Sequence, residues 1–194
     1  TQRFMCSEAK VESNRLRSGK LAQDDWPRLT AACDKLMKAP IYVDDTGSIT
    51  MMELRSKARR LKSREPKLGL IIVDYLQLMS HPSMGGRRPD SRQQEIAEIS
   101  RSLKMLAKEL DIPVIAISQL NRGPEQRTDK RPQMSDLRES GAIEQDADIV
   151  MLLHREDQYD KESSRIGEAD LIVAKHRNGP TDTIALVFQG HYSR

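Results

Sequence analysis

The sequence is poor in aromatic residues, in cysteine and in long apolar runs, and each shortage excludes a class of protein. Phe, Trp and Tyr make up 4% of the 194 residues, so base stacking on an aromatic platform is not expected to hold a nucleic acid here. The two cysteines, Cys6 and Cys33, lie far apart without a histidine or cysteine at metal-ligand spacing. This spacing indicates buried small hydrophobes in a reducing compartment. No apolar run approaches a membrane span and no signal peptide opens the chain, so we expect a cytoplasmic protein without a membrane partner.

The bulk composition is that of one globular domain with a charged surface. Hydrophobic residues make up 37% and charged residues 31% of the chain. Lys and Arg (32) nearly balance Asp and Glu (29), which gives a net charge of +3. This balance permits contact with a polyanion without requiring it.

The first third of the chain has helical patterns. We expect a short helix over residues 2–13 and a second over 21–37, followed by a short strand at residues 41–43. Thr50 and Glu53 have the spacing of a capping box, in which the Thr caps the helix and the Glu bonds back to it. They predict the start of a basic helix that runs to about Arg64.

The pattern changes at Leu68. Residues 70–74 form a continuous apolar run that ends in Asp, typical of a strand buried on both faces, and residues 112–120 predict a second one. Between them lie a basic loop (80–93) and an amphipathic helix, which together make a strand–helix–strand unit with parallel strands. Residues 121–147 predict a long polar loop. The remaining predicted strands cover residues 149–154, 169–176 and 183–188. The prediction is an α/β fold with a central, mostly parallel sheet, helices on its faces and a C-terminal hairpin.

Asp74 and Gln119 follow two neighbouring strands of this predicted sheet. A carboxylate at the carboxyl end of a buried strand lies where α/β sheets bind ligands and where nucleotide hydrolases hold magnesium through water. A neutral amide at the next strand end can hydrogen-bond a γ-phosphate or the attacking water. Alone, either residue could simply cap a turn; together they suit a phosphate sensor.

Lys175 and Arg177 alternate along a predicted strand, so both side chains leave from one face and can converge on one anion. The alternative is a solvated edge strand whose charges discourage aggregation.

The loop at residues 136–142 could present backbone N–H groups and one Arg to a nucleic-acid backbone, with Gly141 allowing close approach. Because the acids of this loop at least balance its one Arg, the loop is a poor electrostatic trap for phosphates, and these residues alone favour an ordinary solvated loop.

Several motifs, taken together and in this order, closely resemble the RecA-like C-terminal motor domain of the DnaB family of bacterial replicative DNA helicases. The resemblance covers the whole chain. The matching stretches are Arg15–Gly19, Leu70–Met79, Ile117–Arg127, Asp136–Asp148 and Ala174–Pro180.

The resemblance implies roles for particular residues. Asp74 resembles the Walker B carboxylate that orders Mg²⁺, and Gln119 resembles the γ-phosphate sensor. Arg177 resembles an arginine finger that reaches ATP on the neighbouring subunit, with Lys175 beside it. The DNA-binding positions that the family implies are Arg138, Glu139 and Gly141 in one channel loop, and Arg87, Arg88 and Arg92 in another.

The family also implies an assembly. Its members are homohexameric rings that use ATP and Mg²⁺ to move 5′ to 3′ on single-stranded DNA, and their partners include primase and a helicase loader. This sequence contains no G-x-x-x-x-G-K-[ST] motif. We therefore expect residues 1–194 to be a partial motor domain, with the P-loop, part of the sheet and an N-terminal collar domain upstream, and to be unable to hydrolyse ATP alone. The alternatives are a non-catalytic subunit-interface or single-strand-binding module, and another RecA-like ATPase.

Overall fold

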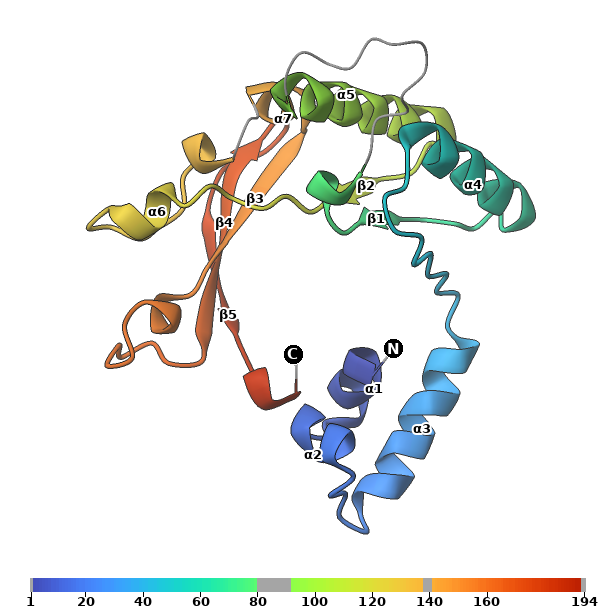
Figure 1. Cartoon of the computed structure of the whole chain (residues 1–194), viewed down its shortest axis with the longest axis vertical. Helices are drawn as coiled ribbons and strands as arrows, with labels where there is room; N and C mark the ends of the chain where they lie inside the picture. Colours follow the sequence, from blue (N-terminus) through green and yellow to red (C-terminus); the bar gives the residue numbers. More distant parts are fainter. Residues whose placement is uncertain (1, 80–91, 138–140, 193–194) are drawn as a thin grey trace. The chain divides into compact units, whose positions relative to one another are not determined.

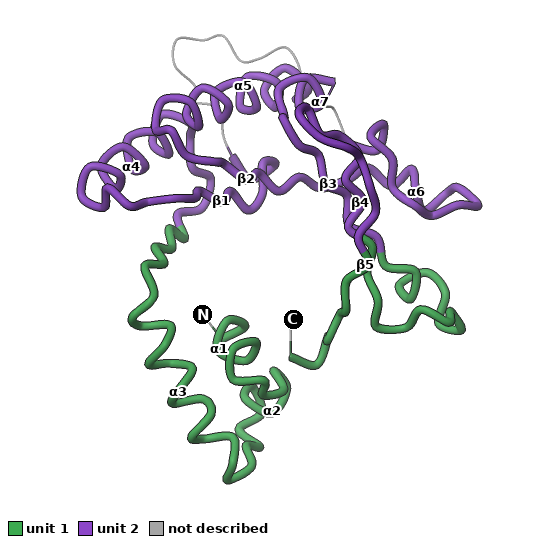
Figure 2. The backbone as a smooth tube through the Cα atoms, turned by 180° about the vertical axis from the view of Figure 1, so that it is seen from behind, with its two compact units in different colours: residues 1–45, 155–170, 185–194 green, residues 46–154, 171–184 purple. Residues whose placement is uncertain are grey.

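The computed structural model describes residues 2–79, 92–137 and 141–192 of the chain, which divide into two compact units. The first unit comprises residues 1–45, 155–170 and 185–194, and the second comprises residues 46–154 and 171–184 (Figure 2). Within the described residues, no helix is long and apolar enough to cross a membrane.

The first unit is built on three helices: α1 (Gln2–Ala9), α2 (Ser13–Ser18) and α3 (Asp25–Lys38). Their apolar faces meet in a small core of Ala9, Val11, Leu29 and Ala32. Helix α2 ends at Gly19, whose φ of 70° is a left-handed conformation that favours glycine. The 3₁₀ turns η3 (Glu156–Gln158) and η4 (Gly190–Tyr192) also belong to this unit.

The strand predicted at residues 41–43 does not form. Ile41, Tyr42 and Val43 lie in irregular backbone and their side chains are exposed. β-Branched residues favour a strand only where a neighbouring strand supplies backbone partners and packing, and no described strand pairs with this segment.

The second unit begins with α4 (Met51–Arg64), and the predicted capping box is present. The Glu53 N–H donates to the Thr50 hydroxyl at 3.2 Å, and the Thr50 N–H donates to the Glu53 carboxylate at 2.9 Å. Strand β1 (Ile71–Val73), the 3₁₀ turn η1 (Leu76–Leu78), α5 (Arg92–Leu110) and β2 (Val114–Ala116) follow. Figure 1 shows α4 and α5 packed beside one another. The core residues are Val73, Leu76, Met79, Ile96, Ile99 and Leu103.

Strands β1 and β2 pair in parallel, with Val73 opposite Ala116, as predicted. The prediction that both faces of these strands are buried is wrong for this chain. Val73 faces the core, whereas Ile72 is 60% exposed and Ile115 is 41% exposed. Helix α5 packs near one face of the pair, and no other segment in the described ranges covers the opposite face.

The other strands form a second sheet in the order β3 (Ile149–His154), β4 (Glu168–His176), β5 (Thr183–Val187). The predicted C-terminal hairpin is present, and the Val173 N–H donates to the Asp182 carbonyl at 2.8 Å. Its turn depends on Gly179, because a Cβ there would lie 2.4 Å from the His176 ring. The α/β class is therefore confirmed, with the described strands in two sheets.

Candidate functional site

The structure brings Asp74 and Gln119 to the same edge of the parallel sheet. Asp74 directly follows β1, and Gln119 lies three residues beyond β2. The segments that follow β1 and β2 stay hydrogen-bonded past the strand ends. The Ile117 N–H donates to the Val73 carbonyl and the Leu76 N–H donates to the Ile117 carbonyl, both at 2.9 Å. Both residues are exposed, so their polar groups are available to a ligand at the carboxyl end of the sheet.

Gln77, on turn η1, is a site residue that the sequence analysis missed. Its side-chain N–H₂ donates to the Ser118 hydroxyl at 3.0 Å and to the Gln119 carbonyl at 3.4 Å. Its side-chain oxygen accepts from the Gln119 N–H at 3.3 Å. The Gln77 amide therefore hydrogen-bonds both the N–H and the carbonyl of Gln119, as a neighbouring strand would.

These residues fit a magnesium nucleotide. Among the described residues, no group of three or more His, Cys, Asp or Glu side chains could hold a metal ion alone. Mg²⁺ does not require such a cage, because it keeps several waters and takes one or two carboxylates plus phosphate oxygens. An exposed carboxylate beside an exposed amide supplies hard oxygen and N–H groups for that arrangement.

Lys175 in β4 and Arg177, one residue beyond its end, both donate to carbonyls at the carboxyl end of α7 (Gly141–Asp146). The Lys175 ammonium donates to the Glu144 carbonyl. The Arg177 guanidinium donates to the Gln145 carbonyl at 3.1 Å. The last carbonyls of a helix have no partner within the helix, so they accept hydrogen bonds from cations.

Asp148 completes this cluster from the other side. Its carboxylate accepts from Lys104 of α5 and lies 3.4 Å from the Arg177 Nε. The hydrogen bond from Lys104, helped by the positive charges of Lys104, Arg177 and Lys175, holds the pKa of Asp148 below its ordinary value. Asp148 is therefore an anion at neutral pH.

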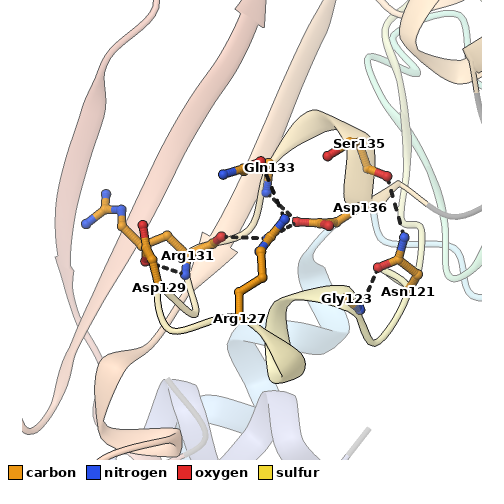
Figure 3. Close-up of polar contacts among 8 residues, drawn as sticks. All are labelled: Asn121, Gly123, Arg127, Asp129, Arg131, Gln133, Ser135 and Asp136. Atoms are coloured by element: carbon orange, nitrogen blue, oxygen red, sulfur yellow. Dashed lines mark hydrogen bonds and ion pairs between the residues drawn. The ribbon is translucent and has the colours of Figure 1, made fainter.

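Residues 120–137, which we call the arm, are more ordered than the predicted polar loop. They contain α6 (Gly123–Gln126) and the 3₁₀ turn η2 (Met134–Asp136), and the ends are joined by an antiparallel bridge between Leu120 and Leu137. Inside the arm, Arg127 pairs with the buried Asp136 at 2.5 Å (Figure 3).

The predicted DNA-binding residues are only partly described. Arg87, Arg88, Arg138 and Glu139 lie outside the described residues. Gly141 is the exposed first residue of α7. Arg92 begins α5, and its guanidinium donates to the Gln77 carbonyl at 2.8 Å and pairs with Glu95. Arg92 is therefore engaged within the chain, and its predicted contact with DNA stays a prediction.

From the role of γ-phosphate sensor that the resemblance implies for Gln119, we expect loss of the Gln77 amide to reduce ATP turnover in the full-length protein. Gln77→Met keeps the length of the side chain but removes its donors and its acceptor, so the backbone of Gln119 loses its support. A small displacement of a catalytic group costs up to about a hundredfold, and we expect kcat to fall about 10- to 100-fold with little change in KM for ATP. Steady-state kinetics, with Gln23→Met at an exposed position as control, check this. Wild-type kcat in Gln77→Met would show that the contact has no function.

Comparisons with known proteins give the chain a family context. The model of the DnaB-like helicase C-terminal domain matches residues 1–194. A replicative DNA helicase DnaB from Leifsonia xyli is 57% identical over 192 residues, which is 99% of this chain and 41% of that protein. The chain thus spans about two fifths of the length of this curated relative.

Two solved structures share the fold. The ATPase domain of G40P is 39% identical, with a TM-score of 0.92 over 99% of this chain and 67% of that one. A DnaB-like replicative helicase, described with its interactions with primase, is also 39% identical, with a TM-score of 0.93 over 99% of this chain and 47% of that one.

Proposed function

The chain belongs to the DnaB-like helicase C-terminal domain family, and from this premise we propose that the full-length protein is a replicative DNA helicase. It assembles as a homohexameric ring, hydrolyses ATP with Mg²⁺, and moves 5′ to 3′ along single-stranded DNA to separate the duplex. The observation that carries the proposal is the placement of Asp74 and Gln119 after the two paired strands β1 and β2, at one edge of the parallel sheet.

In this proposal, Asp74 holds the water ligands of Mg²⁺, which would neutralise charge on the β- and γ-phosphates. Gln119 hydrogen-bonds the γ-phosphate or the attacking water. Gln77 keeps the backbone of Gln119 in place through two hydrogen bonds to it and a third to the Ser118 hydroxyl. The chemistry therefore depends on positioning and charge, as in other phosphoryl transfers.

Arg177 is the proposed arginine finger, acting on ATP held by the neighbouring subunit, with Lys175 beside it. Its contacts are suited to exchange, because both Arg177 and Asp148 are more than half exposed and exposed ion pairs contribute only about 0–1 kcal/mol. A phosphate that carries more charge and offers paired oxygens can replace Asp148 and the Gln145 carbonyl. Hydrolysis would then require assembled subunits.

Arg138, Glu139 and Gly141 are the proposed contacts to the single-strand backbone, and Arg87, Arg88 and Arg92 are proposed for the second loop. Phosphate contacts of this kind hold a strand without reading its sequence. As proposed partners we add primase, because one structural neighbour is described with primase, and a helicase loader. The proposed location is the cytoplasm, at the replication fork.

The test is ATP hydrolysis and strand separation by the full-length purified protein. We expect ATP turnover that single-stranded DNA stimulates, and unwinding of a fork with a free 5′ tail. A full-length protein that binds single-stranded DNA but neither hydrolyses ATP nor unwinds the fork would instead be a non-catalytic module.

A further inference from the structure

Backbone hydrogen bonds join the two ends of the arm to each other. The Leu120–Leu137 bridge joins its first and last residues, and the Asn121 N–H donates to the Asp136 carbonyl at 2.8 Å. Leu120 directly follows Gln119. In a flexible segment of this length, a small displacement at one end would not move the other end in a defined way. Many conformations of such a segment satisfy the same end positions.

Arg127 holds the interior of the arm together. Its guanidinium pairs with Asp136 at 2.5 Å, donates to the Arg131 carbonyl at 3.1 Å, and lies 3.4 Å from the Gln133 side-chain oxygen. Figure 3 shows these acceptors arranged around the planar fork, which has several N–H groups in fixed directions. One side chain thus ties the end of α6 to residues 131–136 at three points.

Asp136 is the partner that makes this joint rigid. It is 3% exposed and also accepts from the Gln133 N–H at 2.7 Å. The arm packs tightly here, because a Cβ at Gly123 would lie 2.8 Å from the Asn121 side-chain oxygen and 3.2 Å from the Asp136 carboxylate. Separating a buried carboxylate from these partners would leave its charge uncompensated, which is costly.

We propose that Arg127 is a positioning residue: its contacts with Asp136, Arg131 and Gln133 make residues 120–137 move as one body with Gln119. When the ligand of Gln119 changes, the resulting displacement of the arm then reaches Leu137, where the chain continues toward α7. Helix α7 in turn packs against α5 and accepts Lys175 and Arg177 at its carboxyl end. The inference rests on the proposed function, because Gln119 is its sensor and single-stranded DNA its readout.

The test measures coupling rather than activity. For the full-length protein, the dissociation constant for a single-stranded oligonucleotide is measured without and with a non-hydrolysable ATP analogue, and the ratio is compared between variants. Couplings between sites typically change affinity about 5- to 150-fold. We expect Arg127→Ala to reduce the ratio at least about 5-fold, with analogue-free DNA affinity near wild type.

Arg165 offers a matched control. It pairs with Asp170 at 2.6 Å, and the exposed fractions of the two side chains, 32% and 4%, match the 33% and 4% of Arg127 and Asp136. Arg165→Ala therefore removes an equally buried ion pair outside the arm. Arg127→Lys is the second variant. It keeps a charge beside Asp136 and so protects the fold, but an ammonium lacks the planar fork that contacts Arg131, Gln133 and Asp136 together.

The outcomes separate the inference from the function on which it rests. A reduced ratio of the two dissociation constants in Arg127→Ala and Arg127→Lys, with a wild-type ratio in Arg165→Ala, supports the inference. A wild-type ratio in Arg127→Lys and in folded Arg127→Ala overturns it, and so does an equal loss in Arg165→Ala. If the wild-type protein binds neither the oligonucleotide nor the analogue, the proposed function itself fails.

Discussion

Arg177→Ala in the full-length protein is expected to lower single-strand-stimulated ATP turnover by about three to five orders of magnitude, the usual effect of losing an arginine finger. The fold should not change. Arg177 is 52% exposed and its contacts are an ion pair with an exposed carboxylate and one hydrogen bond, so the midpoint of thermal unfolding should stay near that of wild type.

Two variants sharpen this expectation. Arg177→Lys keeps the charge but loses the planar fork that binds two phosphate oxygens at once, so it should restore little of the activity. Arg60→Ala, which removes an exposed arginine of α4, should hydrolyse ATP like wild type. Activity near wild type in Arg177→Ala would reduce Arg177 to a surface charge.

Asp74→Asn is expected to lower ATP turnover by at least about a hundredfold, because placing a metal ion on the phosphates contributes several kcal/mol to the transition state. Asparagine has nearly the shape of aspartate, and residue 74 is exposed, so the protein should fold normally. The neutral amide orders the water around Mg²⁺ less well, and the apparent Mg²⁺ requirement should rise.

A magnesium titration of ATP turnover checks this, with Asp34→Asn at an exposed position of α3 as control. Turnover and magnesium dependence unchanged in Asp74→Asn would exclude Asp74 from the metal site.

The sequence predicted those features that depend on local pattern. The capping box at Thr50 and Glu53 follows from a spacing of three residues. Asp74 and Gln119 lie at one sheet edge because parallel strands end at the same edge, and Lys175 and Arg177, two positions apart, both donate to the carboxyl end of α7.

The features that the sequence did not predict depend on contacts between distant residues. Gln77 meets Gln119 across 42 positions of the chain, and Lys104 meets Asp148 across 44. Neither of these separations in sequence follows from a helical or strand period. Arg127 and Asp136 lie nine positions apart in an irregular segment, so no periodicity marks them as partners. The strand expected at residues 41–43 failed for the opposite reason, because local propensity had no neighbouring strand to support it.

The most direct test of the helicase account mixes two inactive full-length proteins, one carrying Arg177→Ala and the other Asp74→Asn. If Arg177 acts on ATP bound to a neighbour, random mixing restores an intact Asp74 beside an intact Arg177 at about one interface in four, because a ring interface is formed by different surfaces of adjacent subunits. The account predicts ATP turnover well above that of either protein alone. A mixture that stays inactive, although labelled subunits demonstrably share rings, would contradict it.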